Sequence, residues 1–272
     1  MSPRQRVPAH AAVSVDVGPL LDAGVMEIEG RLIDASNATF VADLTLDGLT
    51  RRCVYKPIRG ERPLWDFPTG TLAGREVAAR TVSDWLGWHL VPQTVIRDGP
   101  FGPGMCQLWI DTDGRGLVDL MPLGRVSDGW LRVLDAEDQF GNPITLVHAD
   151  DPALARMAVF DVVVNNADRK GGHLLPTPER IYGVDHGVTF HADPKLRTVL
   201  WGWASEPIPQ DILDDVGRLR ARLDDADSVS NLCSLVSPLE VVALRRRITQ
   251  LLRRKTFPGP GNGWPSIPWP AF

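Results

Sequence analysis

Hydrophobic and polar residues alternate with a period of two through much of the N-terminal part of the chain. This is the pattern of half-buried β-strands. The dipeptide Asp47-Gly48, between two such stretches, favours a tight hairpin turn. We therefore expect a mostly antiparallel sheet, preceded by a short helix and a first strand within residues 18–30. The other predicted strands span 40–46, 51–57, 91–97 and 105–110.

A helical period interrupts this strand pattern once. Ala78, Val82 and Trp85 fall on one face of a helix predicted over residues 75–86. Gly87 follows directly and suits the C-terminal stop of that helix. The N-terminal part is thus predicted to combine an antiparallel sheet with one main helix.

Capping signals mark helices in the C-terminal half. Asp151 suits an N-cap and Pro152 the first position of a helix that leads to Asn165. Ser237 and Glu240 form a capping box at the start of another helix. The helical period is seen over 210–223 and 237–255.

The Asp-Thr-Asp-Gly-Arg-Gly segment at 111–116 is a flexible connector and our predicted boundary between two lobes. Residues 117–151 are rich in Gly, Pro and Asp, and we assign no element to them. The last residues contain five prolines and cannot be helical. The predicted units are an N-terminal extension (1–17), an N-lobe (18–110), a C-lobe (111–256) and a Pro/Trp-rich tail (257–272).

Composition limits the class of protein. The 272 residues are 43% hydrophobic, enough for one large domain or two lobes, and the net charge of −5 argues against a strongly basic nucleic-acid surface. Cys53, Cys106 and Cys233 are scattered, which disfavours a disulfide framework or a thiolate zinc site. Residues 1–16 contain no continuous apolar segment, so we do not expect them to act as a signal peptide. No run approaches the ~18 apolar residues of a membrane span. We expect a monomeric cytoplasmic protein without a nucleic-acid partner.

Two polar, glycine-containing loops carry the candidate chemistry. The first contains Asp168, Lys170 and His173, and the second contains Asp185, twelve residues after His173. Apolar segments flank both loops, an arrangement that presents two carboxylates to one cleft. In a phosphoryl-transfer site Asp168 would be the base, Lys170 would neutralise the transferred group, and Asp185 and His173 would hold the metal ion. The alternative for each aspartate is a turn-stabilising role beside glycine.

A lysine and a glutamate upstream fit the same chemistry. Strand alternation puts Val54 and Lys56 on one face, so that Lys56 should point into a cleft. The alternative is an ordinary exposed lysine on an edge strand. Glu76 falls in the first turn of the predicted helix, where it could hold the Lys56 ammonium or simply complement the helix dipole.

These residues resemble a known family. Asn166-Ala167-Asp168-Arg169 through His173, followed by Val184-Asp185-His186-Gly187, is similar to the catalytic and metal-binding loops of the phosphatidylinositol 3-/4-kinase-like superfamily. The patterns there are Asp-Arg-x-x-x-Asn and Asp-x-Gly. The type II phosphatidylinositol 4-kinase branch and the small actinobacterial phosphatidylinositol-kinase-like proteins resemble the chain most, over about residues 32–190.

The resemblance implies an α+β, two-lobed protein-kinase-like fold with a mostly helical C-lobe and ATP in the cleft. It implies Mg²⁺ or Mn²⁺ at Asp185 and His173, and Asp168 as the catalytic residue. Backbone groups near 108–110 would hold adenine. The implied nucleotide-binding residues are Ser36, Asn37, Thr39, Lys56, Glu76, Gln107, Leu108 and Ile110.

The departures from the family pattern bear on the substrate. His173 replaces the usual metal-binding asparagine, and an imidazole suits Mn²⁺ better than Mg²⁺. The predicted phosphate loop has no glycine between Asp34 and Leu46. Lys170 matches protein Ser/Thr kinases rather than lipid kinases. We therefore favour phosphorylation of a protein, including the chain itself, or of a small molecule.

Other functions remain open from the sequence. A nucleotide-binding pseudokinase and an AMP transferase would use the same fold. A metal hydrolase could use the same acids, but the histidines form no HxxxH or HxH pair. There is no G-x-S-x-G nucleophile motif to support acyl transfer. The basic runs at 245–247 and 253–255 are interpreted as a solvated helix face.

Overall fold

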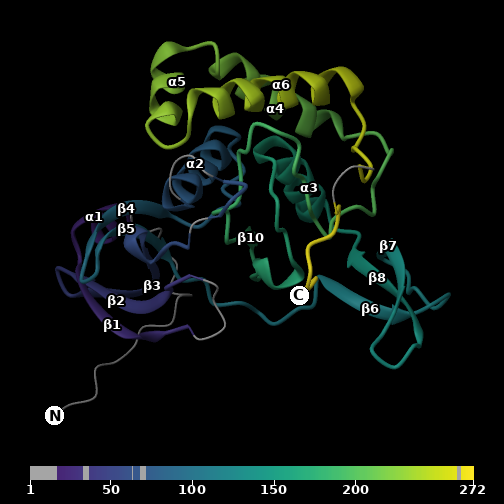
Figure 1. Cartoon of the computed structure of the whole chain (residues 1–272), viewed down its shortest axis with the longest axis horizontal. Helices are drawn as coiled ribbons and strands as arrows, with labels where there is room; N and C mark the ends of the chain where they lie inside the picture. Colours follow the sequence, from purple (N-terminus) through teal and green to yellow (C-terminus); the bar gives the residue numbers. More distant parts are fainter. Residues whose placement is uncertain (1–16, 33–36, 63, 68–71, 262–264) are drawn as a thin grey trace.

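The computed structural model describes residues 17–32, 37–62, 64–67, 72–261 and 265–272. Its N-terminal part is a five-stranded antiparallel sheet in the order β1-β2-β3-β5-β4, with one main helix, α2, beside it (Figure 1). This confirms the predicted sheet and helix. The elements are α1 (Gly18–Ala23), β1 (Val25–Arg31), β2 (Phe40–Leu46), β3 (Leu49–Pro57), η1 (Ile58–Gly60), α2 (Leu72–Trp85), β4 (Thr94–Gly99) and β5 (Gly102–Leu108).

Alternation along β3 divides the sheet into two faces. Cys53 and Tyr55 are fully buried, and Cys53 belongs to a small core under α1. Val54 and Lys56 lie on the opposite, partly exposed face. The strand period therefore aims Lys56 away from the small core, as the alternation predicted.

The hairpin between β2 and β3 turns at Asp47 and Gly48, which both have positive φ, 49° and 80°. Nothing lies within 4 Å of the position that a Cβ on Gly48 would take. Gly48→Ala should therefore lower the free energy of unfolding by about 1 kcal/mol through backbone strain alone. Gly30→Ala is the control. A Cβ at residue 30 would also have no heavy atom within 4 Å, but the φ of Gly30 is not positive. Equal effects of the two changes in urea denaturation would contradict this account.

The C-terminal part is built mainly on helices around the largest hydrophobic core (Figure 1). The Asp151 side chain accepts a hydrogen bond from the Ala153 amide at the start of α3, as its N-cap role predicts. Ser237 and Glu240 form the predicted capping box of α6. These helices are α3 (Pro152–Val164), α4 (Gln210–Arg222), α5 (Ala226–Cys233) and α6 (Pro238–Arg254).

Residues 117–151, which the sequence left unassigned, form a three-stranded antiparallel sheet in the order β6-β8-β7. A two-stranded ribbon of β9 and β10 lies between the two acidic loops. Its first strand follows a short 3₁₀ turn, η2. The elements are β6 (Val118–Pro122), β7 (Trp130–Glu137), β8 (Pro143–Ala149), η2 (Gly171–His173), β9 (Leu174–Pro176) and β10 (Ile181–Gly183).

His148 ties this sheet to the helical core as a neutral imidazole. Its Nδ1 donates to the Ala149 carbonyl, and its Nε2 accepts from the Gly202 amide at 2.9 Å. Burial lowers the pKa of His148 below the ordinary value of 6.5. A lowered folded-state pKa means that the unfolded chain binds the proton more tightly, so this contribution to stability is present above pH ~6.5 and is lost as the pH falls.

We therefore expect His148→Asn to show a shallower loss of unfolding free energy between neutral and mildly acidic pH than the wild-type chain. The variant should also be less stable at neutral pH. Urea denaturation over this pH range measures both. Identical slopes for the two proteins would exclude His148 as a contributor to acid sensitivity.

Helix α2 is tied to the helical part as well as to the sheet. Arg75 Nη1 lies 2.7 Å from Glu240 Oε1 of α6, and both side chains are almost completely buried. The same nitrogen donates to the Thr189 carbonyl at 2.6 Å.

No helix in the described part of the chain has the length and hydrophobicity needed to cross a membrane.

The C-terminal segment returns to the first acidic loop. The Gly171 amide donates to the Ala271 carbonyl at 2.8 Å, and the Ser266 carbonyl accepts from Thr198 and from the indole of Trp201. No helix occurs between residue 257 and the end of the chain in the residues described, 257–261 and 265–272.

Candidate active site

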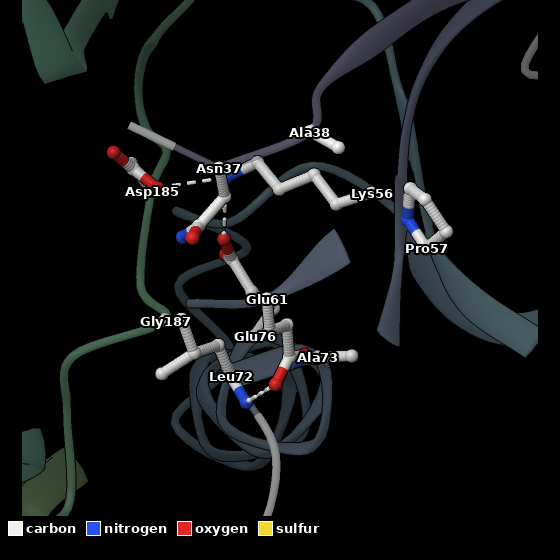
Figure 2. Close-up of a pocket in the computed structure, with 10 residues that line it drawn as sticks. All are labelled: Asn37, Ala38, Lys56, Pro57, Glu61, Leu72, Ala73, Glu76, Asp185 and Gly187. Carbon is white, nitrogen blue, oxygen red and sulfur yellow. Dashed lines mark hydrogen bonds and ion pairs between the residues drawn. The ribbon is translucent and has the colours of Figure 1, made fainter. Parts of the chain in front are cut away.

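Lys56, Glu76 and Asp185 meet in one cluster, although they come from β3, α2 and the second acidic loop. Lys56 Nζ lies 2.9 Å from Glu76 Oε1 and 2.7 Å from Asp185 Oδ1 (Figure 2). The Glu76 side chain is 2% exposed, whereas that of Asp185 is 50% exposed. The cluster therefore has a buried anchor and an oxygen-bearing group at the surface of a cleft.

Electrostatic interactions keep both Lys56 and Asp185 charged. Burial alone would lower the pKa of Lys56, but the carboxylates of Asp185 and Glu76 outweigh it and raise the pKa above its ordinary value. The Lys56 ammonium holds the pKa of Asp185 well below the usual range, against the opposite effect of burial. Each group thus stabilises the ionised form of the other.

Glu76 also positions the loop that carries Asp185. Its second oxygen, Oε2, accepts a hydrogen bond from the His186 amide at 2.8 Å. Asp185 itself has a φ of 61°, so the chain turns sharply at this residue. One buried carboxylate therefore fixes both the ammonium of Lys56 and the backbone next to Asp185.

A pocket opens beside this cluster, and Glu61 lines it. Glu61 caps the start of α2, with its two oxygens accepting from the amides of Leu72 and Ala73 at 3.0 and 2.9 Å. No local spacing rule predicts this cap, because Glu61 lies eleven residues before Leu72 in a stretch predicted as loop. The pocket is lined by Asn37, Ala38, Lys56, Pro57, Glu61, Leu72, Ala73, Glu76, Asp185 and Gly187 (Figure 2).

Asp168 and Lys170 lie together on the first acidic loop. Lys170 Nζ is 3.3 Å from Asp168 Oδ2, and the Asp168 amide donates to Oδ1 of Asn166 at 3.0 Å. Burial raises the pKa of Asp168, Lys170 opposes this rise, and the charge of Asp185 adds to it. Asp168 and Asp185 thus influence each other electrostatically although they lie on different loops.

A buried ion pair joins the two acidic loops to α3. Arg169 Nη2 lies 2.9 Å from Asp161 Oδ1, and both side chains are fully buried. Arg169 also donates to the Val184 carbonyl at 3.0 Å and to Nε2 of His186 at 2.7 Å. Burial, reinforced by Arg169, keeps the pKa of His186 well below its ordinary value, which leaves Nε2 able to accept.

Sequence reasoning assigned no role to Asp161 or Arg169. Asp161 also accepts from Asn166 Nδ2 at 3.0 Å, so it supports the residue that binds the Asp168 amide. A signal was present, since Asp161 is a lone acid within the apolar stretch of α3 and Arg169 follows Asp168 directly. The pairing itself could be seen only in the folded chain.

His173 faces Asp185 across the cleft. Its Nε2 lies 3.5 Å from Asp185 Oδ2, and its Nδ1 accepts from the Lys170 amide at 3.5 Å. Burial lowers the pKa of His173 to about 4, so the ring is neutral at pH 7. Within the described residues, no group of three or more His, Cys, Asp or Glu side chains is arranged to hold a metal ion.

The remaining predicted nucleotide-binding residues are only partly brought to this pocket. Asn37 lines it and accepts from the Arg62 amide, and buried Thr39 donates to the Asn37 carbonyl. Ser36 lies outside the described residues. Gln107 is buried in the sheet and donates to Thr94 Oγ1 at 2.8 Å.

The predicted adenine-binding segment follows β5, away from the lining of the Lys56 pocket. The amide of Leu108 donates to the Gln93 carbonyl, and that of Trp109 donates to the Arg52 carbonyl. Both amides are therefore already hydrogen-bonded within the chain. An adenine contact in this segment would have to use carbonyl groups or Ile110, which is partly exposed.

The fold is kinase-like. The chain superposes on the crystal structure of the Golgi casein kinase with a TM-score of 0.53, covering 86% of this chain and 72% of that chain at 12% sequence identity. The structure of the Golgi casein kinase with Mn/ADP bound gives the same TM-score and identity, with 73% of that chain covered.

No protein-family model matches the chain. The chain belongs to the same family as Protein Rv2133c of Mycobacterium tuberculosis (strain ATCC 25618 / H37Rv). The two sequences are 52% identical over 268 residues, which is 94% of this chain and 96% of the relative.

Proposed function

We propose that the protein is an ATP-dependent phosphotransferase that phosphorylates a protein, including itself, or a small molecule. The observation that carries this proposal is the placement of Lys56 Nζ between the buried Glu76 and the surface-facing Asp185. A fixed ammonium beside a carboxylate is what phosphoryl transfer requires, because the reaction depends mainly on positioning and charge stabilisation. The kinase fold supports the proposal.

In the proposed reaction, the acceptor oxygen attacks the γ-phosphorus and the bond from that phosphorus to the bridging oxygen breaks. ADP leaves with the electron pair, and the acceptor proton passes to the Asp168 carboxylate. The raised pKa of Asp168 suits a general base. Lys56 would bind nucleotide phosphate, and Lys170 would neutralise the transferred group.

The donor set fits a divalent metal ion. Asp185 Oδ2 and the neutral ring of His173 face the same space 3.5 Å apart, and phosphate oxygens and water would complete the ligands. When bound, the ion would neutralise charge on the phosphates. A carboxylate paired with an imidazole favours Mn²⁺ over Mg²⁺. The Golgi casein kinase structure with Mn/ADP supports the use of a nucleotide and such an ion.

The finer assignment to the phosphatidylinositol 3-/4-kinase-like superfamily rests on the Asp168 and Asp185 motifs. We retain it as part of the proposal, with a protein or small molecule as acceptor because Lys170 follows Asp168 at the spacing of protein Ser/Thr kinases.

The test is incubation of the purified full chain with ATP labelled on the γ-phosphate, with Mg²⁺ or Mn²⁺, alone and with candidate acceptors. Transfer of label to the chain or to an acceptor is expected. Label transferred only from the α-phosphate would instead show AMP transfer.

A nucleotide-binding pseudokinase is the second candidate function, favoured by His173 in place of a metal-binding asparagine. In that case ATP with metal would raise the melting temperature without transfer of any label. If ATP with metal neither raises the melting temperature nor transfers label, both candidate functions are overturned.

A further inference from the structure

A second pocket lies between α3, α6 and the segment after the second acidic loop. It is a cavity of about 330 Å³ that shares no lining residue with the Lys56 pocket. Three arginines, Arg246, Arg247 and Arg254, line it, with Gln250 between them. The rest of the lining is mostly apolar, as at Val162 and Leu251, with the polar Asn165 and Thr256. The volume is in the range of small-molecule sites.

Arg247 is the most informative residue of this pocket. Its Nε donates to the Val163 carbonyl at 3.0 Å and its Nη1 to the His191 carbonyl at 3.2 Å. Its Nη2 is buried and makes no hydrogen bond within the described part of the chain. A buried guanidinium nitrogen without an acceptor costs free energy, so Arg247 has a hydrogen-bond donor that no group in the described part of the chain satisfies.

The other two arginines retain donors for an anion, since Arg246 makes one long hydrogen bond, to the Ala192 carbonyl at 3.5 Å. Arg246, Gln250 and Arg254 are spaced at i, i+4 and i+8 and share one face of α6. All three are exposed, and no carboxylate is among the residues that line the cavity in the described structure. The neighbouring Arg245 differs, because it forms an ion pair with Asp224. The interpretation of the two basic runs as a solvated face thus fits the exposed Arg246 and Arg254 but not Arg247.

The charge of Arg247 is costly in the absence of a ligand. Burial, together with the charge of Arg246, lowers the pKa of Arg247 to about 9, and the carboxylate of Glu240 offsets only part of this effect. The guanidinium nevertheless remains ionised at neutral pH, and a bound anion would relieve both effects.

We propose that this cavity binds a small phosphorylated molecule, with its phosphate on the three guanidinium groups and its organic part on the apolar lining. Guanidinium groups bind phosphate with paired, charge-assisted hydrogen bonds, and three of them exceed what a single carboxylate can engage. The site does not depend on the proposed phosphotransferase activity, because it uses none of the residues of the Lys56 cluster.

The test is isothermal titration of the purified full chain with inorganic pyrophosphate and with ribose 5-phosphate at low ionic strength. Arg246→Gln and Arg254→Gln should each weaken binding by about tenfold, the loss expected for one charge-assisted hydrogen bond. The control is Arg253→Gln, because Arg253 directly precedes Arg254 in the same helix but does not line the pocket. This variant should bind the probes like the wild-type chain. Lys56→Met should also retain this binding, which separates the cavity from the nucleotide site.

Three outcomes would overturn the proposal. One is no binding of either probe at millimolar concentration. Another is equal weakening by Arg253→Gln and Arg254→Gln, which would indicate a diffuse charge effect. The third is binding to vesicles containing phosphatidic acid but to neither soluble probe, which would make the ligand a membrane lipid.

Discussion

Replacement of Asp168 by asparagine should reduce the rate of phosphoryl transfer by a factor of about 10²–10⁴, the usual contribution of a general base. Asparagine keeps the shape of the side chain but cannot take the acceptor proton. The free energy of unfolding should not fall, because burial raises the pKa of Asp168 and so already disfavours its charged form. Transfer of γ-label and urea denaturation, measured on the same preparation, test both statements.

Asp128→Asn is the matched control, since Asp128 is exposed and lies in the loop between β6 and β7. It should change neither activity nor stability. Full activity of Asp168→Asn would remove Asp168 from the mechanism. A large loss of stability in Asp168→Asn would instead show that the residue is structural, as in the turn-stabilising alternative.

Replacement of Asp161 by asparagine should lower the free energy of unfolding by about 3–5 kcal/mol, because it leaves the buried Arg169 guanidinium without a counter-charge. The introduced amide would also place donors against those of Arg169. Both acidic loops depend on Arg169, so transfer of γ-label should be lost as well. Urea denaturation and the label assay measure the two effects.

The control for this change is Asp211→Asn, which breaks the Arg156–Asp211 pair at the surface. Exposed pairs contribute less than about 1 kcal/mol, so this variant should unfold almost like the wild-type chain. A loss of less than 1 kcal/mol in Asp161→Asn would mean that the buried pair does not support the site.

The features predicted correctly from sequence are those with local causes. The Asp47-Gly48 turn, the Asp151 cap and the Ser237–Glu240 capping box each depend on residues a few positions apart. Strand alternation likewise predicted that Lys56 lies on the same face of its strand as Val54. These signals predicted the antiparallel sheet with one main helix and the helices of the C-terminal half. The α+β, two-lobed kinase-like fold was implied by the resemblance of the two acidic loops to a kinase superfamily.

The missed features are the ones that join distant parts of the chain. Glu61 at the start of α2, Asp161 with Arg169, and the Arg75–Glu240 pair follow from tertiary packing and have no local spacing rule. The β6-β8-β7 sheet was missed for a different reason. Its strands are separated by glycine turns with positive φ at Gly124, Gly129 and Gly141, and much of β6 and β7 is exposed, which weakens the apolar alternation.

The Arg75–Glu240 pair has a consequence for regulation. In protein kinases the helix that bears the lysine's glutamate partner must be in position for activity, and its displacement is a means of control. Here Arg75 binds that helix to α6 through a buried ion pair, and the next residue, Glu76, holds the His186 amide. Displacing α2 would break a pair whose disruption costs about 3–5 kcal/mol. We therefore expect the Lys56–Glu76–Asp185 cluster to stay assembled rather than to form and break through an on–off movement of this helix.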